Sequence, residues 1–202
     1  MKVVSINRKG KFDIIKFDNG TEAKIYRNTR FEMGIAEGRE MDEIELEKMK
    51  HLSSLECAYD DALKYLKYRP RSVSEVKTRL KKKHYKQEII EKTIKRLKKL
   101  GLLNDDEFVK MWIRDRRNRK PRGRKLIRYE LEKKGIPVEK IKENLSTLTL
   151  EDEIDMARRL IKKRFKKDES IKKERIMNYL FTKGFSLSII QKVLKEMEER
   201  DT

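Results

Sequence analysis

An internal repeat of about fifty residues constrains this chain more than any other feature of its sequence. Six apolar columns recur without gaps at offsets of 51 and then 49 residues, although only 37% of the chain is hydrophobic. In the first copy the columns are Val76, Leu80, Tyr85, Ile90, Ile94 and Leu97. In the second copy they are Ile127, Leu131, Ile136, Ile141, Leu145 and Leu148, and in the third Ile176, Leu180, Phe185, Ile190, Leu194 and Met197. A frame of this kind is typical of an array of small supersecondary units.

The spacing inside each copy is helical. Val76 and Leu80 are four residues apart on one helix face, and Ile90, Ile94 and Leu97 follow the i, i+4, i+7 pattern of another. The segment before them, from about residue 58, has the same period. We therefore predict a mostly α fold in which three tandem three-helix repeats form an elongated modular array. The expected ranges are 37–103 for a linker helix with repeat 1, 104–150 for repeat 2 and 151–202 for repeat 3.

The first 36 residues break this pattern and favour β structure. Segments 2–6, 11–17 and 22–26 are rich in Val, Ile, Phe and Tyr, and the pair Asn19-Gly20 between the last two is a hairpin-turn signal. We predict a small N-terminal antiparallel β meander at 1–36, which rests on the first helices because three short strands are too small to be stable alone. An acidic helix is expected to follow, from about Met41 to about Tyr68.

Local signals mark where several helices begin and end. Ser72-Val73-Ser74-Glu75 is a capping-box pattern, Asn104 precedes a helix start, and Pro137 suits the first turn of the third helix in repeat 2.

The turn before the third helix of each repeat has its own signal. Gly135 and Gly184 follow a helix that ends in Lys, where a left-handed residue closes the turn. His84 stands at the same position in repeat 1. We therefore expect His84 to adopt positive φ as a capping residue, rather than to act as a proton-active or ligand histidine.

The net charge of +19, from 54 Lys and Arg against 35 Asp and Glu, implies strong self-repulsion unless the chain meets an acidic partner. The excess falls into three basic blocks at 77–99, 114–128 and 158–175, one in each repeat, behind an acidic stretch at 37–61. A charged surface of the hyperthermophile type would explain the 44% of charged residues, but not the imbalance. The charge therefore favours a long polyanionic partner, with nucleic acid as the first candidate.

Other features of the composition exclude membrane and secreted classes. No apolar run approaches the roughly 18 residues needed to cross a bilayer, and the N-terminus lacks the apolar core of a secretory signal. Cys57 is the single cysteine and cannot form an internal disulfide, which is typical of a reducing compartment. We expect a soluble cytoplasmic chain with no membrane partner.

Catalytic chemistry has little support in the sequence. His51 and His84 are the two histidines, and neither has the spacing of a metal ligand or of a nucleophile–base pair. Cys57 lies on an apolar helical stretch, where a buried structural thiol is expected. The enzymatic alternative is a metal-dependent nuclease that uses Asp105 and Asp106, but both stand at an expected helix start, where acids complement the dipole. We predict no enzyme activity, no metal and no cofactor.

Candidate contact residues are basic side chains of the three blocks, and seven of them crowd the connection around Pro121 and Gly123. Arg forks bind carboxylates or phosphates through two hydrogen bonds, whereas the alternative is a solvated charged face. Phe108 and Trp112, four residues apart, are expected to pack in the core rather than to stack on bases. The candidates are Arg114, Arg116, Arg117, Arg119, Lys120, Arg122, Arg124 and Lys125, with Lys95 and Arg96 in repeat 1 and Lys162, Lys163 and Arg164 in repeat 3.

Three runs of the sequence resemble the signature of the RecX regulatory proteins of bacteria. They are Leu66-x-x-Arg69-x-x-Ser72-x-x-Glu75-Val76-x-x-x-Leu80-x-x-Lys83, then Leu100-Gly101-Leu102-Leu103-Asn104-Asp105-x-x-Phe108, and then Gly123-x-x-x-Ile127-x-x-Glu130-Leu131-x-x-Lys134-Gly135-Ile136. The resemblance covers about residues 55–200, and the β-rich extension is similar to that of longer members. The chain departs from the family pattern at Asn104, Val109 and His84, where Asp, Ala and Gly are more usual, and repeat 3 matches only in its apolar frame.

This resemblance implies a non-enzymatic regulator of the RecA recombinase. Members of the family are understood to bind along the helical groove of the RecA–DNA filament, which limits strand exchange, ATP hydrolysis and co-protease activity in DNA repair, recombination and the SOS response. They have tandem three-helix repeats and also bind DNA. The expected partners are therefore the RecA filament and single- and double-stranded DNA, with the chain acting as a monomer. The alternative is a stand-alone helical-repeat protein that binds nucleic acid.

Replacing His84 with Gly is expected to leave the free energy of unfolding unchanged or to raise it by up to about 1 kcal/mol, because glycine adopts positive φ without steric cost. Chemical denaturation of the two proteins measures the difference. A loss of about 1 kcal/mol or more would show instead that the His84 side chain makes a stabilising contact of its own.

Overall fold

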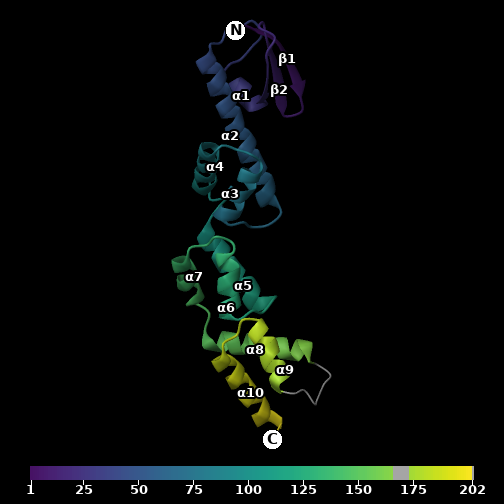
Figure 1. Ribbon diagram of the computed structural model, residues 1–202, viewed down its shortest axis with the longest axis vertical. Coiled ribbons are helices and arrows are strands. Elements are labelled where there is room, and N and C mark those ends of the chain that lie inside the picture. The colour runs from purple at the N-terminus through teal and green to yellow at the C-terminus, as the bar shows by residue number, and fades with distance from the viewer. Residues whose placement is uncertain (166–172, 202) are drawn as a thin grey trace. The chain divides into compact units, whose positions relative to one another are not determined.

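The computed structural model describes residues 1–165 and 173–201, and Figure 1 shows its elements in chain order. The chain divides into two compact units, Met1–Leu103 and Asn104–Thr202. The N-terminal unit contains a three-stranded sheet and the helices of repeat 1, and the C-terminal unit contains the helices of repeats 2 and 3. The prediction of a mostly helical chain, with tandem three-helix repeats after an N-terminal β meander, is confirmed.

Three short strands form the sheet of the N-terminal unit: β1 (Val3–Lys9), β2 (Phe12–Phe17) and β3 (Glu22–Tyr26). They pair antiparallel in the order β1-β2-β3, with Ile15 opposite Ile6 on one side and Ala23 on the other. Gly20 in the second turn has a φ of 80°, which side chains seldom adopt. The meander is as predicted, although β1 begins one residue later than the expected segment 2–6 and extends to Lys9.

One face of the sheet packs against the chain that follows it. Val3, Ile15 and Ile25 are buried in one apolar cluster with Met41 and Met49. The sheet therefore obtains its core from helices, as the small size of the meander requires.

Two helices complete this packing. The long helix α2 (Glu43–Lys67) confirms the expected acidic helix, and Asp42 caps it by accepting a hydrogen bond from the amide of Glu45 at 2.7 Å. The short helix α1 (Arg27–Glu32) lies between β3 and α2 in the chain and is an element that the sequence does not predict. Its six residues are too few for an apolar period, and Tyr26 at its start provides no side-chain cap.

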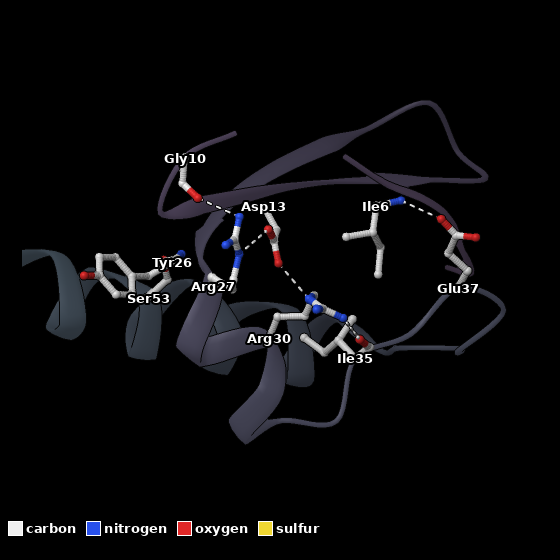
Figure 2. Close-up of polar contacts among 9 residues, drawn as sticks. All are labelled: Ile6, Gly10, Asp13, Tyr26, Arg27, Arg30, Ile35, Glu37 and Ser53. Carbon is white, nitrogen blue, oxygen red and sulfur yellow. Dashed lines mark hydrogen bonds and ion pairs between the residues drawn. The ribbon is translucent and has the colours of Figure 1, made fainter. Parts of the chain in front are cut away.

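A buried carboxylate fixes α1 to the sheet. Asp13 on β2 has no exposed surface, and it accepts hydrogen bonds from Nε of Arg27 at 3.2 Å and from Nε of Arg30 at 2.7 Å (Figure 2). Arg27 also donates to the carbonyl of Gly10 at 2.6 Å, and Arg30 donates to that of Ile35 at 3.3 Å. Because each guanidinium bridges the carboxylate and a backbone carbonyl, the cluster joins the β1–β2 turn, α1 and the segment after α1.

Repeat 1 is built from the second half of α2 with α3 (Val73–Lys82) and α4 (Gln87–Lys99). Ser72 and Glu75 form the predicted capping box at the start of α3. His84 has a φ of 62°, which confirms the expected left-handed turn. The core residues are Ala58 and Ala62 of α2 with the column residues Val76, Leu80, Ile90, Ile94 and Leu97.

The described part of the C-terminal unit contains α5 (Asp105–Asn118), α6 (Arg124–Glu132), α7 (Val138–Leu145), α8 (Leu150–Arg164), α9 (Lys173–Thr182) and α10 (Leu187–Asp201). Their apolar faces form one cluster, in which Ile127, Ile141, Ile176 and Ile190 are buried. Repeats 2 and 3 therefore share one core. In the parts of the chain that the structure describes, no helix combines the length and the apolar character needed to cross a bilayer.

The helix starts of this unit follow local chemistry. Asn104 caps α5 as predicted, since its side-chain oxygen accepts hydrogen bonds from the amides of Asp106 at 2.9 Å and Glu107 at 3.4 Å. Pro137 differs from the prediction, because it stands at the N-cap of α7 rather than in its first turn. Its ψ of 140° is extended, so the helix begins one residue later, at Val138.

Repeats 2 and 3 are joined by two glycines. The amide of Gly123 donates to the carbonyl of Lys183 at 2.8 Å, and the amide of Lys125 donates to that of Gly184 at 3.3 Å. A Cβ on Gly184 would lie 2.4 Å from the Cβ of Leu126, and one on Gly123 would lie 2.3 Å from the carbonyl of Gly184. The start of α6 and the α9–α10 turn are thus in direct backbone contact, which only glycine allows.

Gly184→Ala is expected to lower the free energy of unfolding by at least about 2 kcal/mol. Its φ of +85° is costly for alanine, and the new methyl group would lie 2.4 Å from the Cβ of Leu126. Gly101→Ala is the matched control, because Gly101 has a φ of +68° but nothing within 4 Å of an added Cβ. The control should cost only about 1 kcal/mol. Equal losses in chemical denaturation would show that the close approach between repeats 2 and 3 accommodates an added methyl group without further cost.

Asp13→Asn is expected to destabilise the N-terminal unit by about 3 kcal/mol, because it leaves two guanidinium groups against a neutral amide at a buried position. Glu22→Gln is the control, since Glu22 and its partner Lys16 have side chains that are 50% and 51% exposed. Exposed pairs of this kind contribute less than about 1 kcal/mol. Urea unfolding of both variants gives the comparison, and a loss for Asp13→Asn no larger than that of the control would contradict the role of the buried carboxylate.

Candidate functional site

The α5–α6 connection, residues 119–123, carries the densest group of predicted contact residues and is held at both ends. Arg159 on α8 donates to the carbonyl of Arg117 at 2.7 Å and to that of Asn118 at 3.2 Å, which satisfies carbonyls at the end of α5. At the other end, Gly123 is fixed by its 2.8 Å hydrogen bond to Lys183. The connection therefore presents its side chains from a defined backbone.

Arg116 is a structural member of the predicted set rather than an exposed one. Its side chain is only 14% exposed, and it pairs with Asp115 at 2.5 Å and with Glu130 at 2.6 Å. Its guanidinium also lies 4.2 Å from the ring centre of Trp112. These contacts join α5 to α6 and leave Arg116 little capacity to bind a partner.

Arg124 and Arg117 join repeat 2 to repeat 3. Arg124 donates from its amide to Glu153 at 3.1 Å and from Nε to the same carboxylate at 3.3 Å, and it also binds the carbonyl of Leu148. Glu153 has a side chain that is only 8% exposed, so Arg124 is its necessary counter-charge. Arg117 pairs with Asp152 at 2.5 Å. Both arginines are therefore used by the fold.

Two further members of the set are also engaged. Arg96 pairs with Glu56 at 2.6 Å and lies 4.0 Å from the ring centre of Tyr59, which ties α4 to α2. Arg122 donates to the carbonyl of its neighbour Pro121 at 3.0 Å.

The remaining eight predicted residues are exposed. Arg119 is 84% exposed and has only a distant contact with Asp115 at 4.0 Å. Among the described residues, no carboxylate lies within ion-pair distance of the other seven. Part of the third basic block, residues 166–172, lies outside the described residues. The exposed set is Arg114, Arg119, Lys120 and Lys125 in repeat 2, Lys162, Lys163 and Arg164 at the end of α8, and Lys95 in repeat 1.

The two aromatic residues of α5 pack as predicted. Phe108 is 4% exposed, and its ring centre lies 5.7 Å from that of Trp112 in a stacked arrangement. The indole N–H of Trp112 donates to Glu130 at 2.8 Å, and Lys134 lies 4.5 Å from its ring centre. Trp112 is half-buried and its polar and aromatic groups are both engaged within the C-terminal unit.

The histidines and paired acids form no catalytic arrangement in the described residues. Nε2 of His51 lies 3.1 Å from Nζ of Lys92, and His84 is exposed at its turn. Asp106 pairs with Lys140 at 2.5 Å in the first turn of α5, the position at which an acid favours the helix dipole. Over the ranges 1–165 and 173–201, no three His, Cys, Asp or Glu side chains are grouped so that they would hold a metal ion.

The half-buried ionisable groups of repeat 1 are also engaged. The hydroxyl of Tyr85 donates to Asp61 at 2.8 Å, and Nζ of Lys83 lies 2.7 Å from the same carboxylate. Burial alone raises the pKa of Asp61, but the hydrogen bonds from Lys83 and Tyr85 outweigh it and hold this pKa below its ordinary value. Burial is the main cause that raises the pKa of Tyr85 and of Cys57. Cys57 is therefore an unreactive thiol at neutral pH.

Two arginines outside the predicted set have an unusual environment. Arg71 and Arg79 both lie over the ring of Tyr65, at 3.9 Å and 5.7 Å from its centre. Sequence reasoning did not single them out, although a signal was present: Arg69-Pro70-Arg71 in the first repeat corresponds to Lys120-Pro121-Arg122 in the second, at the offset of 51 residues.

Family models match the chain three times in tandem. The first, second and third three-helix domains of RecX match residues 58–97, 104–145 and 151–194. Together these ranges cover more than half of the chain, and each contains most of the apolar frame of one repeat.

Individual relatives agree with the family models. The regulatory protein RecX of Bacillus subtilis is 31% identical over 81% of this chain, and that of Bacillus cytotoxicus is 32% identical over 82%. The chain spans 64% and 63% of the length of these two relatives.

Solved structures have the same fold. A crystal structure of regulatory protein RecX has a TM-score of 0.73 and 24% identity, over 96% of this chain and 98% of that one. The crystal structure of RecX from Lactobacillus salivarius has a TM-score of 0.62 and 28% identity, over 72% of this chain and 97% of that one. With three tandem domain matches, similar relatives and a shared fold, this chain belongs to the RecX family of regulatory proteins.

Proposed function

We propose that this chain binds the filament that the RecA recombinase forms on DNA, and that it limits strand exchange, ATP hydrolysis and co-protease activity there. Membership of a family whose curated relatives are regulatory proteins supports this role. The chain would act in DNA repair, recombination and the SOS response, as a cytoplasmic monomer with no catalytic activity of its own.

The observation that carries the proposal is a set of cations that the fold does not use. Arg119 is 84% exposed, and Lys120 and Lys125 are exposed without a carboxylate within ion-pair distance in the described chain. Similar side chains occur at the end of α8 and on α4, so all three repeats contribute. A modular array with a basic group on each unit suits a long partner that presents negative charge at regular intervals.

A stand-alone protein that binds nucleic acid is the second candidate, and the same exposed cations favour it. Such a protein would bind naked DNA or RNA tightly, with an affinity that falls by decades between about 50 and 200 mM salt. An affinity for the RecA filament far above that for naked DNA would favour the filament regulator over the stand-alone nucleic-acid-binding protein.

The direct test adds the protein to RecA on single-stranded DNA with ATP. ATP hydrolysis and strand exchange are expected to fall as the protein is titrated. A protein bound in the filament would hinder the changes in contact between RecA subunits on which both activities depend. Undiminished activity at saturating protein would contradict the proposal.

A charge-reversal variant tests whether the exposed basic residues on α5 and in the α5–α6 connection make the contact. The triple variant Arg114→Glu, Arg119→Glu and Lys120→Glu is expected to weaken inhibition of the filament ATPase by at least about tenfold in protein concentration. Arg124 is left unchanged, since its reversal would place two carboxylates together at the buried Glu153 and unfold the C-terminal unit.

The matched control has the same change in net charge on another surface. Lys2→Glu, Lys9→Glu and Lys48→Glu alter exposed lysines of the N-terminal unit that lie outside the basic blocks. Inhibition by the control should stay close to that of the wild-type protein. If both triple variants lose inhibition equally, bulk charge rather than this basic surface of repeat 2 accounts for binding.

A further inference from the structure

Tyr65, near the end of α2, has two arginines over its ring. The guanidinium carbons of Arg71 and Arg79 lie 3.9 Å and 5.7 Å from the ring centre. Arg71 comes from the α2–α3 connection and Arg79 from α3, so two elements converge on one aromatic side chain. Both cations lie within cation–π distance of the ring, and a guanidinium held in this way can still donate hydrogen bonds from its N–H groups.

No carboxylate balances these two positive charges. In the described chain, neither Arg71 nor Arg79 has an acidic group within 4.0 Å or a hydrogen bond to its side chain, and Nε of Arg71 is buried without a partner. The contrast with Arg69 in the same connection is informative, because Arg69 pairs with Glu75 at 2.6 Å. Two arginines on one ring without a carboxylate leave a local excess of positive charge, which an added anion would balance.

Repeat 2 also has an arginine over an aromatic ring, and there a carboxylate balances the positive charge. Arg116 lies over the ring of Trp112 at 4.2 Å, and Glu130 accepts hydrogen bonds from both, at 2.6 Å and 2.8 Å. Glu130 corresponds to Arg79 at the offset of 51 residues that superposes Leu80 on Leu131. Repeat 1 therefore has a second arginine where repeat 2 has the carboxylate that completes the cluster.

We infer that the two arginines on Tyr65 form a binding site for a backbone phosphate of single-stranded nucleic acid. Paired guanidinium forks bind phosphate oxygens through several hydrogen bonds, and the contacts of both with the Tyr65 ring bring them together before the ligand arrives. In the bound state the phosphate supplies the negative charge that Glu130 supplies in repeat 2.

An exposed tyrosine close to Arg71 in the sequence points to a strand of nucleic acid rather than to an isolated anion. Tyr68 caps the end of α2, three residues before Arg71, and its side chain is 83% exposed. Lys67 next to it is exposed and has no carboxylate within ion-pair distance in the described chain. An exposed aromatic ring near a phosphate site provides a stacking surface for an unpaired base, the combination that binds single strands without sequence preference.

This inference rests on the proposed function only in the choice of DNA as the ligand, and its test needs no recombinase. The probe is a fluorescently labelled oligothymidylate of about twenty residues, and binding is followed by fluorescence anisotropy at several salt concentrations. The double variant Arg71→Gln with Arg79→Gln is expected to weaken binding at least about tenfold and to reduce the slope of log affinity against log salt by about 0.7 to 1.4, for the loss of one or two ionic contacts.

Two single variants separate the contributions. Tyr68→Ala should weaken binding about tenfold and leave the salt slope unchanged, because stacking releases no counterions. Arg79→Glu introduces the residue type of repeat 2 and should close the site by pairing with Arg71. Lys77→Glu is the control on the same helix, since Lys77 is exposed without a carboxylate within ion-pair distance in the described chain. It should have less than a third of the effect of Arg79→Glu.

The outcomes separate this site from the proposed function. A double variant that folds with an unchanged melting temperature, loses the oligothymidylate and still inhibits the RecA filament supports the site and the function independently. The phosphate site would be overturned if the double variant kept its affinity and salt slope. It would also be overturned if Lys77→Glu lost as much affinity as Arg79→Glu. A wild-type protein that inhibits the filament but does not bind the oligothymidylate would also overturn it, while the proposed function would stand.

Discussion

The rest of the structure depends on the backbone hydrogen bonds that close the left-handed turn between the second and third helices of each repeat. In each case one helix carbonyl accepts two backbone hydrogen bonds from the residues of the turn. The carbonyl of Leu80 accepts them from Lys83 and Tyr85 at 3.0 and 3.4 Å, that of Leu131 from Lys134 and Ile136 at 3.0 and 3.2 Å, and that of Leu180 from Lys183 and Phe185 at 3.0 and 3.2 Å. This turn reverses the chain within a few residues, so that apolar residues before and after it enter the same core.

The apolar columns and the turn are shared by the three repeats, but the side chain that precedes the turn is not. At the position one residue before the carbonyl that closes the turn, repeat 1 has Arg79, repeat 2 has Glu130 and repeat 3 has Tyr179. Glu130 joins α5 to α6 through Trp112 and Arg116, whereas Tyr179 packs its ring edge-on against Phe165 at 5.6 Å. Because the turn and the apolar columns hold the backbone, a different side-chain interaction at this position in each repeat is compatible with the same fold.

Sequence patterns predict the local features of this chain well. The helical spacing of the columns, the capping box at Ser72 and the positive φ of His84 each depend on residues within about two turns of helix, and all three are found in the structure. The missed features have other causes. Helix α1 is too short to show a period. Helix α7 begins at Val138, one residue after Pro137, because the ψ of Pro137 is extended.

The roles of individual arginines are harder to predict, because their partners are distant in the sequence. Arg116 is fixed by Glu130 and Arg124 by Glu153, which are 14 and 29 residues away. Neither spacing is a helical i, i+3 or i, i+4 pair, so a single sequence does not indicate that these two differ from the exposed Arg119. The sequence predicts where positive charge gathers. Only the three-dimensional structure distinguishes the cations that pair with carboxylates from those that stay exposed.

That separation explains why a strong net charge is compatible with a stable fold. Each one-to-one ion pair removes one cation and one carboxylate, so pairing leaves the excess of 54 over 35 charged groups unchanged at +19. What the fold controls is the position of the excess. It places carboxylates such as Glu130 and Glu153 at the joints between helices, where an unpaired arginine would cost most. The cations that stay unpaired include exposed residues on and beside the α5–α6 connection, residues at the end of α8 and the two arginines over Tyr65, which are the places where we propose contacts with an acidic partner.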